Sequence, residues 1–267
     1  MPKFNKRIKK KINMHKVGII GYGKMGQIRH KAILELGNCE LIAVSEPSSE
    51  AKKAKVPNLS HDEIINHPDI DVVIICTPNF LNKPLAIAAL NSGKHVFCEK
   101  PPAFTEKDIH EVMAAEQLSR GKKLMYGFNH RHHDSIINMK QLVDSGEYGK
   151  VVWMRGRYGK SVTADYYNEW RSKKELAGGG ILMDQGIHML DLFLYLGGDF
   201  DKVMAEVSNL YWHMDTEDNA FVILKNTANG MAASLHSTMT QWRHLFSLEV
   251  FLEKTIIYEK DENGIAT

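Results

Sequence analysis

The sequence predicts an α/β protein with a doubly wound parallel sheet in its N-terminal half and an α+β domain with an open, mostly antiparallel sheet in its C-terminal half. Two observations support this fold class. Up to about residue 128, short Val- and Ile-rich runs alternate with helical patterns, as in parallel sheets covered on both faces. Beyond it, longer runs are separated by turn-like segments such as "NTANG". We therefore expect domains at 16–128 and 129–267, after a basic segment at 1–15.

The N-terminal half is expected to contain five strands, at 16–20, 39–46, 71–77, 95–99 and 123–128. Helical patterns between these strands cover residues 24–36, 83–93 and 105–121. Each of the three ends near Gly or Asn, which is a common signal for the end of a helix. Strands and helices that alternate at this spacing predict parallel strands joined by helical crossovers.

The C-terminal half begins with a predicted helix at 134–146 and a strand at 151–159. A loop rich in Tyr and Trp and a run of three glycines lead to an apolar helix at 181–196. Further strands are expected at 201–212, 219–226, 230–241 and 245–259. This order of elements predicts a helix packed against a mostly antiparallel sheet.

Composition and charge restrict the possible functions. Of the 267 residues, 43% are hydrophobic and 25% are charged, and the net charge is +2, as is usual for a globular enzyme without a nucleic-acid partner. No apolar run reaches the roughly 18 residues needed to span a membrane. The segment 1–15 is interpreted as a solvated, disordered tail, with an arm for nucleic acid or an anionic membrane surface as the alternative.

The three cysteines, Cys39, Cys76 and Cys98, lie far apart and at or near the ends of apolar runs. An odd number at such spacing favours buried thiols in a reducing compartment over a disulfide framework or a metal site. We therefore expect a cytoplasmic protein.

The segment "KVGIIGYGKMGQIRH" places three glycines between a predicted strand and a predicted helix. In this context the first glycine permits a tight turn, the second lets the backbone approach a pyrophosphate, and the third allows close packing of helix on strand. The amides at the start of the helix would then face the phosphates of a dinucleotide. The cofactor-binding residues expected here are Gly21, Gly23, Lys24, Met25 and Gly26.

Glu46 ends the second predicted strand, 25 residues after Gly21. A carboxylate in this place can accept hydrogen bonds from both ribose hydroxyls of NAD and would repel the additional phosphate of NADP, so NAD is favoured. Thr77, Pro78 and Asn79 follow the third strand, where ligands of such sheets bind. A proline turn with an Asn helix cap explains these three residues equally well.

The segment "HVFCEKPPAF" ends the fourth strand with Glu99 and Lys100, followed by two prolines. Pro101 restricts the backbone directly after the lysine, so the direction of the lysine side chain is set by the fold. We hypothesise that the Lys100–Pro101 bond is cis. At the ligand edge of the sheet, Glu99, Lys100 and Pro101 are expected to contact the cofactor, and Lys100 to exchange a proton with a substrate hydroxyl.

The apolar helix at 181–196 contains three polar residues, Asp184, His188 and Asp191, at positions i, i+4 and i+7. This spacing puts them on one face of the helix. Unpaired burial of such groups would cost several kcal/mol, so they pair with one another, cap backbone groups or line a cavity. Opposite a candidate lysine, this stripe indicates a site more than a set of satisfied core residues.

The motifs "GYGKMG", "CTPN", "GKHVFCEKP" and "GGGILMDQGIHMLD" together resemble the glucose-fructose oxidoreductase, inositol dehydrogenase and MocA (Gfo/Idh/MocA) family over residues 14 to about 255. The resemblance implies a Rossmann domain, an α+β domain whose open sheet often forms an oligomer interface, and a catalytic lysine at Lys100. It also implies a functional aspartate and histidine at Asp184 and His188. We assign His188 as general acid and base, Asp184 as substrate anchor or orienter, and Asp191 as structural support.

Two further segments contribute candidate substrate-binding residues. In the resemblance, "GFNHRHHD" lies at the end of the interdomain strand, where Asn129 and Arg131 would touch substrate or nicotinamide. The histidines of this segment fit no familiar ligand spacing, so no metal is expected. Trp170 and Arg171 suit a sugar ring or a phosphate, with an interface loop as the equal alternative.

The sequence therefore predicts an NAD-dependent oxidoreductase that acts on the CH–OH group of a sugar, cyclitol or nucleotide-linked sugar in carbohydrate metabolism. A non-catalytic, NAD-binding regulatory or interaction protein on the same fold is the alternative, and an enzyme for an unsaturated ring or an imine is a third. Members of this family usually run well beyond 267 residues, so we expect a shortened chain or a sheet edge covered in an oligomer. The expected assembly is a homodimer or homotetramer formed through the C-terminal sheet.

Overall fold

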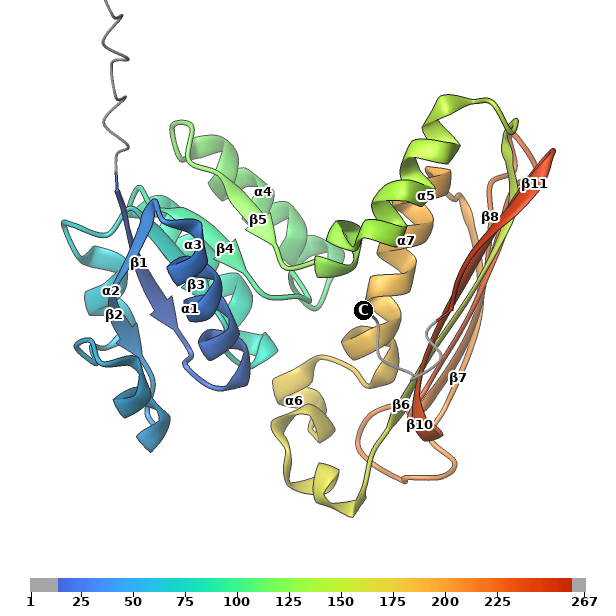
Figure 1. Ribbon diagram of the computed structural model, residues 1–267. Helices are drawn as coiled ribbons and strands as arrows, with labels where there is room; N and C mark the ends of the chain where they lie inside the picture. The colour runs from blue at the N-terminus through green and yellow to red at the C-terminus, as the bar shows by residue number, and fades with distance from the viewer. Residues whose placement is uncertain (1–13, 261–267) are drawn as a thin grey trace, which may run out of the picture. The chain divides into compact units, whose positions relative to one another are not determined.

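The computed structural model describes residues 14–260, so nearly all of the expected basic tail at 1–15 lies outside the described residues. The chain divides into two compact units (Figure 1). Unit 1 comprises Met1–Thr77, Leu81–Glu99 and Lys107–Met125, and unit 2 comprises Pro78–Phe80, Lys100–Glu106 and Tyr126–Thr267.

Unit 1 is built on a five-stranded sheet with the order β2-β1-β3-β4-β5. The pairs β1–β2, β1–β3 and β3–β4 are parallel, which confirms the predicted doubly wound sheet. The strands are β1 (His15–Ile20), β2 (Cys39–Ser45), β3 (Val72–Ile75), β4 (His95–Cys98) and β5 (Leu124–Tyr126).

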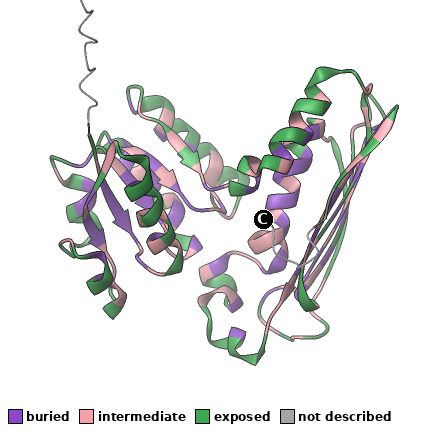
Figure 2. Ribbon diagram, viewed as in Figure 1, coloured by how far each residue is buried: buried purple, intermediate pink, exposed green. Residues whose placement is uncertain are grey.

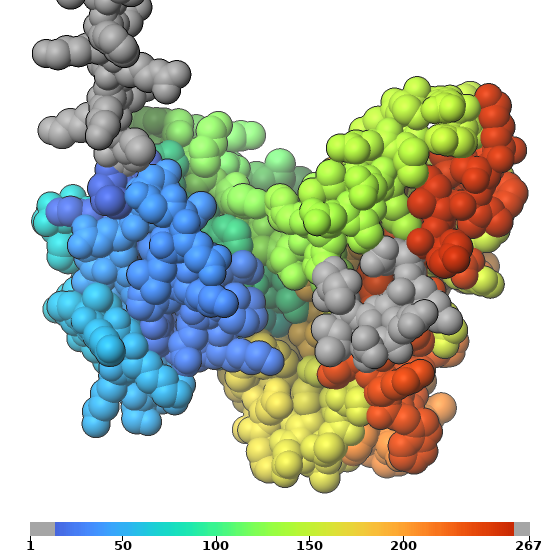
Figure 3. Space-filling view, in the orientation of Figure 1, coloured from blue at the N-terminus to red at the C-terminus, as the bar shows by residue number. Residues whose placement is uncertain are grey.

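Helices cover both faces of this sheet. Gly26 of α1 (Lys24–Leu36) packs toward Ile19, whereas Ile64 of α2 (His61–Asn66) packs toward the neighbouring Gly18, and successive residues of a strand point to opposite faces. α3 (Asn82–Asn91) and α4 (Glu106–Leu118) complete the helices of the unit. Figure 3 shows the surface of unit 1 that carries α1, in blue. Leu34 and Leu36 of this helix are exposed.

The short helix α2 was not among the predicted elements, although the sequence contains a signal for it. Ser60 accepts a hydrogen bond from the Glu63 amide, and the Glu63 carboxylate accepts one from the Ser60 amide, which is a capping box. The pattern Ser-x-x-Glu before two isoleucines could therefore have indicated where this helix begins.

Unit 2 is built on a six-stranded sheet with the order β11-β10-β6-β9-β8-β7. Only the pair β6–β9 is parallel, so the sheet is mixed and mostly antiparallel, as predicted. The strands are β6 (Val151–Ser161), β7 (Lys202–Ser208), β8 (Asn219–Lys225), β9 (Ala232–Thr238), β10 (Thr240–Leu252) and β11 (Thr255–Lys260).

The prediction of the last strand was wrong. The predicted strand at 245–259 is a hairpin, in which β10 turns into β11 between Leu252 and Thr255. The turn has neither Gly nor Asn; instead the Glu253 and Lys254 amides donate to the carbonyls of Lys150 and Tyr148. Because these partners lie about 100 residues away in the sequence, the local pattern gave no turn signal.

The core of unit 2 lies between the sheet and α7 (Ile187–Gly197), whose buried residues are purple in Figure 2. A Cβ atom on Gly156 of β6 would lie 2.4 Å from Met189 and 2.9 Å from Phe193, so this glycine lets the helix approach the strand closely. α5 (Asp134–Ser145) packs against the same core through Ile136 and Met139.

One turn before α7 departs from the predicted helix. Residues Leu182–Gly186 form a π-helix, in which the Ile187 amide donates to the Leu182 carbonyl five residues earlier. The short helix α6 (Lys174–Ala177) precedes this turn. Within residues 14–260, no helix combines the length and the apolar character that crossing a membrane requires.

Candidate active site

The three glycines of the turn between β1 and α1 have different structural roles. Gly21 has φ +87°, and a Cβ atom there would lie 2.5 Å from the Cys76 carbonyl oxygen. A Cβ atom on Gly26 would lie 2.2 Å from the Gly21 carbonyl oxygen, so no other residue fits at the point where α1 crosses the strand. A Cβ atom on Gly23 would meet nothing within 4 Å. The turn therefore leaves open space beside its second glycine.

This open space lies at the beginning of α1, where Gly23 is the N-cap and has no side chain to bond the first helical amides. Such amides are ready donors for an anion, and the positive end of the helix dipole adds to the attraction. The turn thus fits the pyrophosphate of a dinucleotide, with Lys24 and Met25 in the first turn of the helix.

Glu46 lies directly after β2, close to the same turn. Its carboxylate accepts hydrogen bonds from the Tyr22 amide at 2.7 Å and from the Ser48 amide at 3.0 Å. Burial alone would raise the pKa of Glu46, but the hydrogen bonds from Ser48 and Tyr22 outweigh burial and hold this pKa below its usual value. Glu46 is therefore a carboxylate at neutral pH, with lone pairs left for ribose hydroxyls.

A buried hydrogen-bond chain follows the carboxyl ends of β3 and β4 in unit 1. Thr77 Oγ1 lies 3.4 Å from Asn82 Oδ1, and Asn82 Nδ2 donates to the Glu99 carbonyl at 3.1 Å. The Glu99 carboxylate binds Arg29 of α1, with Oε1 at 2.7 Å from Nε and 2.5 Å from the terminal nitrogen. The candidate cofactor contact Glu99 is thus paired within unit 1, through an arginine that the sequence did not indicate.

Asn79 belongs to unit 2. It is buried, and its Nδ2 atom donates to the Ala177 carbonyl at 2.8 Å at the end of α6. This hydrogen bond joins two segments 98 residues apart. The Asn79 side chain thus has a structural role. Neither the predicted cofactor contact nor the alternative of a helix cap included this role.

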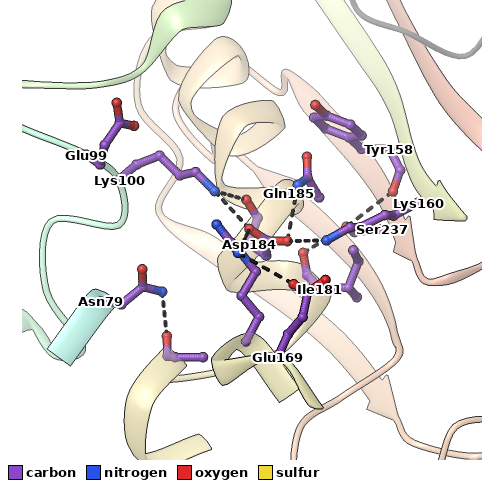
Figure 4. Close-up of polar contacts among 12 residues, drawn as sticks. Asn79, Glu99, Lys100, Tyr158, Lys160, Glu169, Ile181, Asp184, Gln185 and Ser237 are labelled. Carbon is purple, nitrogen blue, oxygen red and sulfur yellow. Dashed lines mark hydrogen bonds and ion pairs between the residues drawn. The ribbon is translucent and has the colours of Figure 1, made fainter. Parts of the chain in front are cut away.

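Lys100 is the first residue of its segment of unit 2, and the Lys100–Pro101 bond is cis, as hypothesised. Its Nζ atom donates to Asp184 twice, at 2.5 Å to the carbonyl oxygen and at 3.0 Å to Oδ1 (Figure 4). The π-helical turn positions Asp184 so that its backbone and its side chain both face the ammonium group. The structure therefore brings together two of the three predicted catalytic residues.

The Asp184 carboxylate is surrounded by cations. Lys160 at the end of β6 donates to Oδ2 at 3.1 Å, and Arg171 Nε lies 3.8 Å from Oδ1. Gln185 Nε2 adds a donor at 3.2 Å to Oδ2 (Figure 4). Burial would raise the pKa of Asp184, but the charges of Lys100, Lys160 and Arg171 prevail and keep this pKa well below its usual value. Asp184 is therefore ionised although most of its side chain is shielded from solvent.

The glycines before Asp184 hold this turn in place through Glu217. Gly178 has φ +83°, and a Cβ atom on Gly180 would lie 2.0 Å from the Glu217 carbonyl oxygen. The Glu217 carboxylate accepts hydrogen bonds from the Gly180 amide at 2.7 Å and the Leu182 amide at 3.1 Å. A carboxylate at the start of the helical segment is also favoured by the helix dipole.

His188 is the third predicted catalytic residue and is 4% exposed. Its Nδ1 atom has no hydrogen-bond partner among residues 14–260. Burial, and then the charge of Lys100, lower the pKa of His188 well below its usual value, so the imidazole is neutral at pH 7.

The ring of His130 packs against His188 at a tilt of 38°, with 4.3 Å between the ring centroids. Its Nε2 atom lies 3.2 Å from the Tyr158 hydroxyl. Burial, and then the nearby His133, lower the pKa of His130 to about 4. The imidazole rings of His130 and His188 are therefore both uncharged at neutral pH, and they lie near the Lys100–Asp184 pair.

The remaining candidates are placed as follows. Arg131 binds Asp191 through two hydrogen bonds, at 2.7 and 2.5 Å, so its guanidinium is engaged within unit 2. Asn129 is exposed at the start of the short helix Asn129–His132. Arg171 stacks on Trp170, with its guanidinium carbon 4.4 Å from the ring centroid. In the described part of the chain, no group of three or more His, Cys, Asp or Glu side chains is placed to hold a metal ion.

Sequence reasoning missed Lys160 and the two tyrosines near it, Tyr158 and Tyr166. Alternation along β6 contained a signal for the first two, since Tyr158 and Lys160 share the face of the core residue Met154. A lysine on the buried face of a strand requires a partner, and here the partner is Asp184. Tyr166 lies in the short helix Ala164–Asn168, whose place near Asp184 follows only from the fold.

Two family models match this chain. Residues 15–128 match "Oxidoreductase family, NAD-binding Rossmann fold", and residues 136–258 match "GFO/IDH/MocA C-terminal domain". Together the two matches cover most of both units and correspond to the parallel sheet and the mixed sheet.

Similar proteins include several sugar and cyclitol dehydrogenases. A levoglucosan dehydrogenase of Pseudarthrobacter phenanthrenivorans is 34% identical over 211 residues, which are 72% of this chain and 53% of the relative. An inositol 2-dehydrogenase of Salmonella typhimurium is 33% identical over 162 residues, 57% of this chain and 48% of the relative. The chain thus spans about half the length of these relatives. A solved structure of a levoglucosan dehydrogenase with NADH and levoglucosan superposes with a TM-score of 0.86 at 27% identity, covering 93% of this chain and 73% of that one.

Proposed function

Because the chain belongs to the Gfo/Idh/MocA family of oxidoreductases, we propose that it is an NAD-dependent dehydrogenase of a sugar, cyclitol or nucleotide-linked sugar. The main support is the buried arrangement in which the Lys100 ammonium is held by Asp184, next to the neutral imidazole of His188. Oxidation of an alcohol requires a base for the hydroxyl proton and is accelerated by a cation near the oxygen, and His188 and Lys100 suit these two roles.

The roles of these residues follow from their charges. Bound NAD supplies the hydride acceptor, the C4 atom of nicotinamide. The hydroxyl proton must leave as the hydride is transferred, and the unpartnered Nδ1 atom of His188 can accept it. Lys100 stabilises the negative charge that develops on the oxygen, and Asp184 orients Lys100. Reduction of a carbonyl uses the same groups in reverse.

We assign cofactor binding to the glycine turn and to Glu46, with Lys24 and Met25 in the first turn of α1. The open space at Gly23 supports binding of a dinucleotide. The ionised Glu46 supports NAD over NADP, because the additional phosphate of NADP would face a carboxylate. Thr77, Pro78, Asn79, Glu99 and Pro101 stay predictions as cofactor contacts. For the substrate we keep Asn129, Arg131, Trp170 and Arg171 as candidates, together with Asp184 and His188.

We also propose a cytoplasmic homodimer or homotetramer formed through the sheet of unit 2, with domains at 16–128 and 129–267. The edge strand β7 exposes Val203, Met204 and Val207, and Phe221 and Ile223 are exposed on the sheet face that points away from α7. Exposed apolar side chains on a sheet are typical of surfaces that pair with another chain. The three free cysteine thiols are compatible with a reducing compartment.

The test combines NADH absorbance with two lysine variants. Purified protein is mixed with NAD and a panel of free sugars, cyclitols and nucleotide sugars, while NADH and NADPH binding are titrated by fluorescence. We expect at least one panel member to reduce NAD. We expect Lys100→Met to lower turnover by roughly two orders of magnitude or more, and to leave NADH affinity unchanged.

Lys140→Met is the matched control, because Lys140 pairs with Asp144 on the exposed face of α5. Near-normal turnover in Lys100→Met would overturn the catalytic assignment. NADH binding without turnover on any panel member would instead favour a non-catalytic, NAD-binding regulatory protein.

A further inference from the structure

Three cations share the carboxylate of Asp184. Lys100, Lys160 and Arg171 all lie within 3.8 Å of the two oxygens of this one carboxylate. Two further carboxylates lie near: Glu169, which is 3.6 Å from Arg171 and half-exposed, and Glu217, whose oxygens accept hydrogen bonds from the Gly180 and Leu182 amides. Cations that share one carboxylate in a partly buried site retain donors for a further anion.

The guanidinium of Arg171 is held in place by its neighbours but makes no hydrogen bond among residues 14–260. Its separations from Asp184 and Glu169, 3.8 and 3.6 Å, exceed hydrogen-bond distance, and no hydrogen bond of this group is found within residues 14–260. Stacking on Trp170 fixes its plane. A planar fork of N–H donors with a fixed orientation is suited to two-point binding of a carboxylate or phosphate.

Lys160 also retains donors after it has bound Asp184. Its side chain is about one-fifth exposed, and its ammonium lies 4.7 Å from the centroid of the Tyr166 ring. An ammonium group has three donors, and only one hydrogen bond of Lys160 is found in the described residues, the one to Asp184 at 3.1 Å.

Tyr166 provides an independent observation that points to a ligand. Its residue is 4% exposed, and its hydroxyl has no hydrogen-bond partner in the described part of the chain. Burial, and then the charge of Asp184, raise the pKa of Tyr166, so the phenol keeps its proton. A buried, protonated hydroxyl within electrostatic reach of Arg171 and Asp184 is a donor without an acceptor.

We propose that Arg171 and Lys160, with the Tyr166 hydroxyl, bind an oxyanion of the substrate, so that the sugar-type molecule carries a carboxylate or a phosphate group. This inference rests on the proposed dehydrogenase function and narrows its substrate class. A neutral sugar offers no charge to Lys160 and Arg171, whereas an oxyanion can accept the hydrogen bonds that these two groups and the Tyr166 hydroxyl do not make within residues 14–260.

The test uses the full-length protein with saturating NADH and measures Trp fluorescence, because Trp170 adjoins Arg171. The probes are D-glucuronate, D-glucose 6-phosphate and D-glucose, which share a ring and differ in charge. We expect one of the two anions to bind about tenfold or more tightly than glucose, as hydrogen bonds to charged groups allow. The preference should decrease as salt concentration rises. The better of the two anions identifies the oxyanion as carboxylate or phosphate.

Variants assign the effect to residues. Arg171→Gln and Lys160→Gln should each reduce the preference for the anion about tenfold, and Arg171→Lys should restore part of it. Arg157→Gln is the matched control, because Arg157 is exposed on the opposite face of the same strand, β6. NADH titration of each variant shows whether its cofactor binding is intact.

Equal affinity for glucose and both anions in the unmodified protein would overturn the inference, as would binding of none of the three probes. That comparison needs no variant, so a variant that fails to fold does not affect it. Turnover of neutral and charged sugars with equal efficiency would refute the inference and leave the dehydrogenase function standing. Preferential anion binding without any hydride transfer would refute the dehydrogenase function and leave the oxyanion site standing.

Discussion

Replacing Asp184 by Asn tests whether one carboxylate holds the cationic cluster of unit 2 together. Asn has nearly the same shape and still offers Oδ1 as an acceptor for Lys100, so the change removes charge with little change in volume. It leaves Lys100, Lys160 and Arg171 around a neutral group. The side chain of Asp184 is 13% exposed, and solvent therefore compensates only a small part of the lost attraction.

The expected loss of stability follows from the geometry. Removing one partner of a buried ion pair costs about 3–5 kcal/mol. The substituted amide would keep an acceptor for Lys100 at Oδ1, but its NH2 group would face the donors of Gln185 and Lys160, which bind Oδ2 in the unmodified protein. We therefore expect a loss of at least about 3 kcal/mol. With a urea dependence of about 1–3 kcal/mol per molar, this corresponds to a shift of the unfolding midpoint by roughly 1–3 M.

Tryptophan fluorescence is the appropriate assay, because all four tryptophans, Trp153, Trp170, Trp212 and Trp242, belong to unit 2. The signal therefore reports the unfolding of the unit that contains the substitution. Asp144→Asn is the control, because Asp144 is 58% exposed and pairs with Lys140 on the helix surface. Such exposed pairs contribute about 0.2–1 kcal/mol, so this variant should unfold close to the unmodified protein.

The pH dependence gives a second test with a defined sign. Because the folded protein holds the pKa of Asp184 below its usual value, this group contributes its full stability above the unfolded pKa of about 3.9. The contribution is lost as the pH falls through the folded pKa. The gap between the protein and Asp184→Asn should thus be constant from about pH 5 to 8 and should narrow only in stronger acid. Equal midpoints at pH 7, or a gap that narrows as the pH rises, would refute the charge-based explanation.

Two further predictions concern the cofactor turn and the base. Gly23→Ala should weaken NADH binding about tenfold or more and leave the melting of unit 1, followed by circular dichroism, unchanged, because its Cβ points into open space. Gly26→Ala should destabilise unit 1 by about 1–3 kcal/mol, because its Cβ would meet the Gly21 carbonyl. The opposite pattern would contradict the assigned roles. The turnover rate at saturating NAD and substrate should stay constant as the pH falls from 8 to 6, since the pKa of His188 is well below its usual value and the base stays neutral in this range. A loss of rate with an apparent pKa near 6.5 would exclude His188 as the base.

The parallel sheet of unit 1 could be predicted because its signals are local. The helix predicted at 24–36 is α1, Lys24–Leu36, since an apolar face and a following glycine are both visible in the sequence. Gly37 indeed ends the helix with φ +69°. The hairpin between β10 and β11 could not be predicted, because Glu253 lies against Gly149 and the turn depends on contacts across the sheet.

The candidate site shows the same division. Lys100, Asp184 and His188 could be named from the sequence, because a lysine before prolines and a polar stripe on an apolar helix both break the local pattern. Lys160 breaks a pattern too, but only if the inward face of β6 is known. Glu217 and Tyr166 break none, and they reach the turn at Asp184 only through long-range folding. The π-helical turn itself also requires tertiary contacts, since Ser237 of β9 donates to the Ile181 carbonyl at 3.3 Å.

The cluster at Asp184 combines features that oppose folding. A buried carboxylate, three cations with unequal compensation, a neutral histidine with an unpartnered nitrogen and a phenol without an acceptor all cost free energy relative to an apolar core. Elsewhere in unit 2 the contacts of α7 with the sheet are apolar, as local stability requires. Natural proteins depart from such consistency mainly where a ligand or a reaction repays the cost. These departures surround one carboxylate. The Nδ1 atom of His188 lacks a donor, whereas Arg171, Lys160 and the Tyr166 hydroxyl have donors left without an acceptor among residues 14–260. A hydroxyl group that is to be oxidised, on a molecule that also carries an oxyanion, would supply both the proton for His188 and the acceptor for Arg171, Lys160 and Tyr166.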